Sequence, residues 1–109
     1  MDPKPEFCVV LVTTPNETSA KSIAQKLLQE KLAACINYFA VESFYTWEGK
    51  LNQDHEFQLT IKTQRQLFSP LSQRVIELHP YDTPEIIALP IIEGSQDYLT
   101  WLRESTLRP

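Results

Sequence analysis

The residues best suited to hold a metal ion in this sequence lie in the segment ELHPYDTPEIIALP, at residues 77–90. His79 offers an imidazole nitrogen, and Asp82 and Glu85 offer carboxylate oxygens three and six residues later. This is a mixed donor set for a divalent cation. The competing interpretation is structural, because a histidine that ends a helix is stabilised by the helix dipole and by the unpaired carbonyls there.

Other reactive side chains are few. His55 lies in the polar segment NQDHE, where exposure to solvent competes with a ligand role. Cys8 lies in an apolar run and Cys35 between a helix and a strand, and their spacing predicts free thiols rather than a disulfide or a metal site. With two glycines and no Ser/His/Asp or Cys/His signature, the sequence has neither a phosphate loop nor a nucleophile–base pair. We predict that the protein is not an enzyme.

The composition is that of an acidic globular protein. The net charge is -4 and the isoelectric point is near 5.1, whereas nucleic-acid binding needs a basic surface. No segment approaches the roughly 20 apolar residues that span a bilayer, and MDPKPEF does not resemble a signal peptide. We therefore expect no nucleic acid or membrane partner, a cytoplasmic location, and a single domain over residues 1–109.

The elements that position these side chains follow from hydrophobic spacing. Residues 7–13 form an apolar, β-branched run typical of a strand buried on both faces. Apolar residues at helical spacing follow from Ala20 and predict a helix that ends near Ala34, capped by Thr14 or Asn16.

A hairpin and a second helix come next. Residues 36–48 are aromatic and β-branched, residues 56–63 alternate between polar and apolar, and Gly49 supplies the turn between these two strands. Apolar residues from Leu67 to Leu78 predict a helix that Pro80 stops.

The remaining apolar run, PEIIALPII, predicts a buried fourth strand, in which Pro90 indicates an edge position or a bulge. A short C-terminal helix follows, with Tyr98, Leu99 and Leu102 on its apolar side. The order β-α-β-β-α-β-α predicts an α+β ferredoxin-like sandwich, with an antiparallel sheet, helices on one face, a long central hairpin and a C-terminal helix.

The hairpin is too long for a single subunit. A compact domain of this length is about 34 Å across, from a radius of gyration of roughly 13 Å. Each arm of about 13 residues spans ~44 Å. The overhang carries Phe44, Tyr45 and Trp47, so we predict that the hairpin packs against other copies in a closed homo-oligomer.

The polar side of the third strand is the other candidate surface. Glu56 and Lys62 point away from the face that carries Phe57, Leu59 and Ile61. Because helices cover only one face of such a sheet, these charged residues either meet solvent or line a cleft between subunits.

Several motifs resemble the CutA family of divalent-cation tolerance proteins. They are EKLAACIN at 30–37, FYTWEGKL at 44–51, IKT at 61–63, HPYDTPEII at 79–87 and YLTWL at 98–102. The resemblance extends from about residue 7 to 107. It implies a ferredoxin-like subunit in a homotrimer similar to PII signalling proteins, and a role in tolerance of copper and other divalent cations.

The resemblance also implies a copper site, which this sequence carries only in part. Val12 stands where some bacterial members have a thiol, and Leu78 and His79 stand where they have a histidine pair. Only His79 remains as a metal ligand, and one imidazole is a weak site. Copper or another divalent cation is therefore expected to bind weakly or indirectly.

The matching motif residues are expected to line an inter-subunit cleft for a small polar ligand. They are Trp47, Lys50, Glu56, Lys62, Tyr81 and Glu85. The lysines would supply positive charge, Tyr81 a phenol donor, and Glu85 an acceptor or a ligand for a hard metal ion. Three functions stay open: a cation-responsive trimer, a PII-like signalling module and a structural scaffold.

Overall fold

The computed structural model describes residues 4–108, in which four strands form one antiparallel sheet in the order β2-β3-β1-β4. The elements are β1 (Phe7–Thr14), α1 (Glu17–Gln29), β2 (Cys35–Trp47), β3 (Lys50–Gln64), α2 (Phe68–Leu78, after a 3-10 turn at Arg65–Leu67), β4 (Ile86–Pro90) and α3 (Gln96–Glu104). The predicted ferredoxin-like order is confirmed, including the C-terminal helix.

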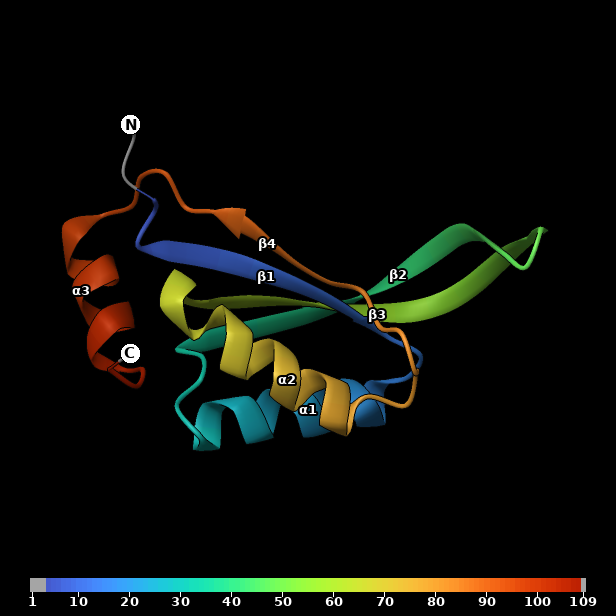
Figure 1. Ribbon diagram of the computed structural model, residues 1–109, viewed down its shortest axis with the longest axis horizontal. Coiled ribbons are helices and arrows are strands. Elements are labelled where there is room, and N and C mark those ends of the chain that lie inside the picture. Colours follow the sequence, from blue (N-terminus) through green and yellow to red (C-terminus); the bar gives the residue numbers. More distant parts are fainter. Residues whose placement is uncertain (1–3, 109) are drawn as a thin grey trace.

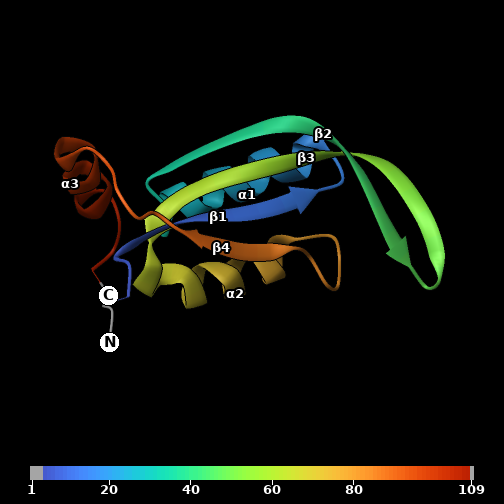
Figure 2. The same ribbon diagram turned by 90° about the horizontal axis from the view of Figure 1, so that it is seen from above.

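The two long helices cover one face of the sheet. Figures 1 and 2 show α1 and α2 side by side against this face, with α3 beyond one end of the sheet. The core lies between them and consists of fully buried aliphatic side chains: Val10, Val12, Leu59 and Ile61 from the strands, and Ile23, Leu27, Leu71 and Val75 from the helices. No helix within residues 4–108 is long and apolar enough to cross a bilayer.

The other face of the sheet, here called the open face, carries no helix among the described residues. Strand alternation and register place on it Val9, Leu11, Phe39, Val41, Ile87 and Leu89. The edge position that Pro90 indicated is confirmed, because β4 is the last strand of the sheet, but the predicted burial is wrong for the single chain, in which Ile87 and Leu89 are 49% and 50% exposed. One apolar side of β4 packs toward the helices, and the other lies on the open face, where no described residue of the single chain covers it.

The first helix begins at the predicted cap but ends early. Asn16, rather than Thr14, caps α1, because its Oδ1 accepts the Ser19 N–H at 2.8 Å. At the other end the Leu32 N–H donates to the carbonyl of Leu27 at 2.9 Å, in a Schellman turn. The helix therefore stops at Gln29, five residues before the predicted end.

Lys31 is the residue that reverses the chain in this turn, with φ of 57°. An L-residue in this left-handed conformation costs roughly 1–2 kcal/mol, whereas glycine adopts it freely but loses more backbone entropy on folding. We expect Lys31→Gly to raise the free energy of unfolding by about 0.5–1 kcal/mol, measured by urea denaturation. A Lys31→Ala control, which removes the side chain but keeps the strain, should not stabilise the protein.

The central hairpin projects beyond the rest of the sheet (Figure 1). Its arms pair continuously to Trp47↔Lys50, and Glu48 and Gly49 have φ of 52° and 76°, as in a type I′ turn. The first residues of β3, up to Glu56, pair with β2 alone, because β1 begins its pairing at Phe57. The predicted overhang is confirmed, and its aromatic residues are exposed.

Candidate functional site

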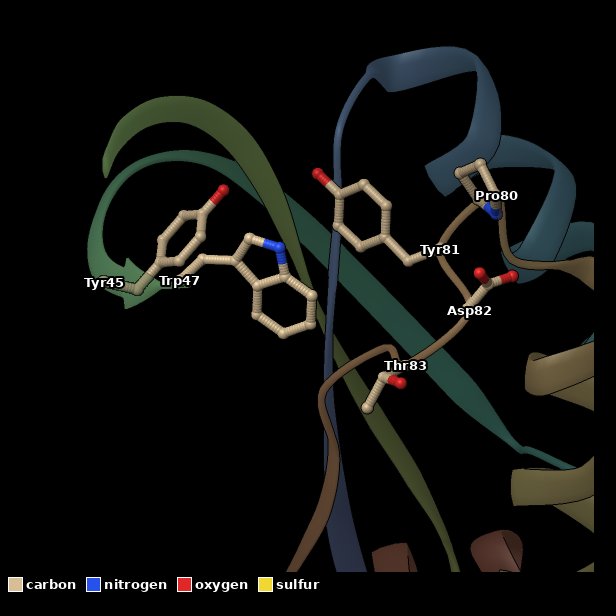
Figure 3. A pocket seen from close by; sticks show the side chains of 6 residues that line it. All are labelled: Tyr45, Trp47, Pro80, Tyr81, Asp82 and Thr83. Atoms are coloured by element: carbon tan, nitrogen blue, oxygen red, sulfur yellow. The ribbon is translucent and has the colours of Figure 1, made fainter. Parts of the chain in front are cut away.

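A pocket forms where the hairpin faces the loop between α2 and β4. Figure 3 shows Tyr45 and Trp47 projecting from the hairpin opposite Tyr81 of the loop. The cavity has a volume of about 470 Å³ and is lined by Tyr45, Trp47, Pro80, Tyr81, Asp82 and Thr83. We call it the aromatic pocket. Its walls come from the two motifs that the sequence analysis singled out, the YTWEGK and HPYDTPE segments.

His79 fixes the loop that carries Tyr81. Its backbone leaves the helical conformation, and its side chain, 8% exposed, accepts the Tyr81 N–H at Nδ1 over 3.0 Å. Because Nδ1 accepts, Nε2 carries the proton and donates to the carbonyl of Thr13 at 2.8 Å. The imidazole thereby ties the loop to the end of β1.

Tyr81 crosses from the loop to the third strand. Its hydroxyl donates to Oε2 of Glu56 at 3.0 Å, and Glu56 is only 6% exposed. Burial of the phenol, followed by the hydrogen bond to Glu56 and the negative charge of that carboxylate, raises the pKa of Tyr81 to about 12. The hydroxyl therefore acts as a hydrogen-bond donor near neutral pH, and the carboxylate as its acceptor.

Two more hydroxyl–carboxylate pairs surround this one. Tyr45 donates to Asp54, and this hydrogen bond raises the pKa of Tyr45. Thr13 donates to Oε2 of Glu85 at 3.3 Å. A second cavity, of about 320 Å³, shares Tyr45 with the aromatic pocket and is lined by Thr13, Ser43, Phe44, Tyr45, Glu56 and Glu85.

The charge of this region is negative and uncompensated. None of the ion pairs within residues 4–108 includes Asp54, Glu56, Asp82 or Glu85. The residues that line the two cavities include no lysine or arginine. The arrangement therefore favours a positively charged ligand over an anion.

Of the six residues expected to line a ligand cleft, the structure brings four together. Trp47 and Tyr81 line the aromatic pocket, and Glu56 and Glu85 line the cavity beside it. Lys50 is exposed at the hairpin tip, opposite Trp47 in the strand pairing. Lys62 lies at the far end of β3 and donates to the side-chain oxygen of Asn37.

Tyr45, Asp54 and Thr13 are parts of this site that were not expected from the sequence. Tyr45 was expected only as one of the aromatic residues of the overhang. The spacing of Tyr45 and Trp47, two residues apart on one strand, already places both side chains on the same face. The other two residues are identified only by the folded arrangement.

Comparison with known proteins places the chain in a family. The sequence model of the CutA1 divalent ion tolerance protein family matches residues 8–105. The chain belongs to this family. The divalent-cation tolerance protein CutA of Thermus thermophilus is 50% identical over 99 residues, which cover 90% of this chain and 96% of that protein.

Plant members of the CutA1 family are equally similar. The chloroplastic CutA of Arabidopsis thaliana is 52% identical over 90% of this chain, which spans only 54% of that longer protein. The crystal structure of CutA1 from Oryza sativa superposes with a TM-score of 0.93 at 45% identity, covering 97% of this chain and 98% of that one. The fold and its long hairpin are thus those of the CutA1 family.

The hydrogen bonds and neighbours of His79 determine whether it could bind a metal ion in this CutA1 family member. Both ring nitrogens of His79 are engaged, so an ion at either one would displace a hydrogen bond. Within residues 4–108, no three side chains of the types His, Cys, Asp and Glu are grouped to share an ion. Val12 is fully buried in the core, and Cys8 and Cys35 are free thiols, as predicted. Metal binding through His79 stays a prediction.

The raised pKa of Tyr81 gives a prediction for alkaline pH. The folded protein holds this phenolic proton to about pH 12, whereas an unfolded chain releases it near pH 10. The stabilisation is therefore fully present below about pH 10 and is lost as the pH rises from there through about 12. A spectrophotometric phenolate titration should show a late phase that Tyr81→Phe removes. Glu56→Gln should shift this phase to lower pH, and an unchanged phase in both variants would contradict the assignment.

Proposed function

We propose that this protein acts in tolerance of divalent cations, as the names of its relatives state, and that it binds such ions weakly or affects them indirectly. The observation that carries this proposal is the group of uncompensated carboxylates around Glu56. Carboxylate oxygens are the ligands preferred by hard divalent cations. They also raise the local concentration of any cation without a complete coordination sphere.

Weak binding follows from the geometry of the single chain. Glu56 and Glu85 each already accept a hydrogen bond from a protein hydroxyl. His79 is committed through both nitrogens. An ion would have to replace these partners, which lowers its net affinity. A tightly held copper cofactor is therefore not part of the proposal.

The assembly that we propose is a homotrimer. Its support is the exposed overhang, where Phe44 is 65% exposed, and the apolar open face of the sheet. Contiguous apolar surface of this kind marks an interaction site. In a closed symmetric assembly, every copy of that surface is buried against a neighbouring subunit.

A PII-like module that binds a small ligand is the second candidate, and the cavity of about 470 Å³ favours it. Within one chain, the lysines expected to hold a polar ligand lie away from this pocket, so the single chain does not favour an anionic metabolite there. A purely structural trimeric scaffold would leave the cavity without a role. We propose binding rather than catalysis, in the cytoplasm, although the compartment differs within the family, since the Arabidopsis relative is chloroplastic.

Calorimetric titration with Zn²⁺ and Cu²⁺ tests direct binding. We expect dissociation constants in the weak range of about 10⁻⁴ to 10⁻³ M seen for loosely organised carboxylate sites. Glu85→Ala should weaken binding, and Lys62→Ala, on the same face but far along β3, should not. His79→Ala reports whether the imidazole contributes. If neither ion binds, direct binding is wrong; if expression of the protein also leaves growth in graded copper and zinc unchanged, the tolerance role is wrong.

A further inference from the structure

We propose that the aromatic pocket binds an organic ammonium cation, of the quaternary or multiply alkylated kind. The inference goes beyond tolerance of metal ions, because it concerns a different class of cation and adds the aromatic residues to the carboxylates. It depends on three properties of the described residues: the aromatic walls, the uncompensated negative charge, and the size of the cavity.

The walls include three electron-rich aromatic rings. Tyr45, Trp47 and Tyr81 line the cavity and are 39%, 61% and 38% exposed. The aromatic pairs within residues 4–108 do not join any two of these three rings, so the rings do not close on one another. Figure 3 shows that Trp47 and Tyr81 approach the pocket from opposite segments. Ring faces arranged around a space attract ammonium groups through their quadrupoles.

The hydrogen bonds of the two tyrosines hold these walls in place. The hydroxyl of Tyr45 donates to Asp54, and that of Tyr81 donates to Glu56 at 3.0 Å. Both phenols therefore point their protons away from the cavity and toward carboxylates. This fixes the ring orientations before a ligand arrives, which lowers the entropic cost of binding.

The charge favours a cation and excludes an anion. Glu56 is 6% exposed and is paired with a neutral phenol rather than with a base. Asp82 lines the cavity, and Asp54 lies behind Tyr45. None of these three carboxylates belongs to an ion pair among the described residues. A bound cation would supply the missing positive charge.

The dimensions favour an organic group over a metal ion. The volume of about 470 Å³ lies within the roughly 300–1,000 Å³ of small-molecule pockets. A metal ion needs several oxygen or nitrogen atoms close together, and the described residues bring no three such side chains to one point. An alkylated ammonium is large and weakly hydrated, and it needs ring faces rather than a coordination shell.

Choline and its uncharged isostere 3,3-dimethyl-1-butanol test the proposal in the assembled protein. Trp47 and Trp101 are the two tryptophans, so a Trp101→Phe background leaves Trp47 as the only indole reporter. We expect choline to change the fluorescence of Trp47 saturably. The isostere should bind at least about tenfold more weakly, because it lacks the charge that the rings and carboxylates attract.

Two variants identify the residues, with choline binding followed by calorimetry. Trp47→Leu and Glu56→Gln should each weaken binding by about tenfold, whereas Trp101→Phe, at an indole that is 45% exposed and lies outside the pocket, should not. Glu56→Gln keeps the shape of the side chain, so it remains decisive if Trp47→Leu fails to fold. Equal binding of choline and its isostere, or no choline binding because a second copy fills the pocket, would overturn the proposal. Neither result bears on the zinc and copper titrations, which test the metal role separately.

Discussion

Replacing Ile87 by glutamate is expected to convert the proposed homotrimer into a monomer. Ile87 lies on edge strand β4 and projects from the apolar open face with 49% of its surface exposed in the single chain. In the proposed trimer this surface becomes an interface, and an unpaired carboxylate buried there costs several kcal/mol in each subunit. Light scattering should report a mass that falls from about three times 12.6 kDa to that of one chain.

The matched control is Ile76→Glu. Ile76 lies on α2 and is 47% exposed, almost the same as Ile87, but it belongs to the helical side of the molecule. The same change of charge there should leave the trimer intact. If both variants remain trimeric, the open face is not the interface; if wild type is itself a monomer at micromolar concentration, the trimer proposal is wrong.

The fold could be predicted almost completely because its signals are local. The buried run of β1, the alternation along β3 and the glycine turn of the hairpin each depend on neighbouring residues only. The end of α1 could not be located, because Leu32 continues the helical spacing although the chain has already reversed at Lys31. Pro90 indicated the edge position of β4, but the apolar run predicted burial that the single chain does not provide.

The site was only half predicted, for a geometric reason. Alternation shows that Glu56 and Lys62 share a face, but six residues of strand separate them by about 20 Å, so within one chain they do not line the same pocket. The meeting of Tyr81 with Glu56 depends on how the loop after α2 folds back over the sheet. The spacing of apolar residues in the sequence does not predict the path of this loop. The role expected for the lysines in a cleft between subunits stays a prediction, while the aromatic and acidic residues already lie close together in the single chain.

His79→Ala is expected to lower the free energy of unfolding by about 3 kcal/mol. The substitution leaves the Thr13 carbonyl and the Tyr81 N–H without their partners, and each unsatisfied buried group costs about 1–3 kcal/mol. It also leaves a cavity in place of the imidazole, because His79 is only 8% exposed. Urea denaturation at one fixed protein concentration should show the loss, because the stability of an oligomer depends on concentration.

Two further substitutions separate the hydrogen bonds of His79 from its packing. His79→Gln places an amide near the position of Nε2 and can keep the bond to Thr13, whereas His79→Asn places one near Nδ1 and can keep the bond to Tyr81. Each should recover part of the stability that alanine loses. Only the asparagine variant should also preserve the late phenolate phase of Tyr81, because it keeps the loop that delivers Tyr81 to Glu56. If all three variants are as stable as the wild type, the imidazole contributes nothing to the fold, and a ligand role would be the remaining explanation for His79 at the end of α2.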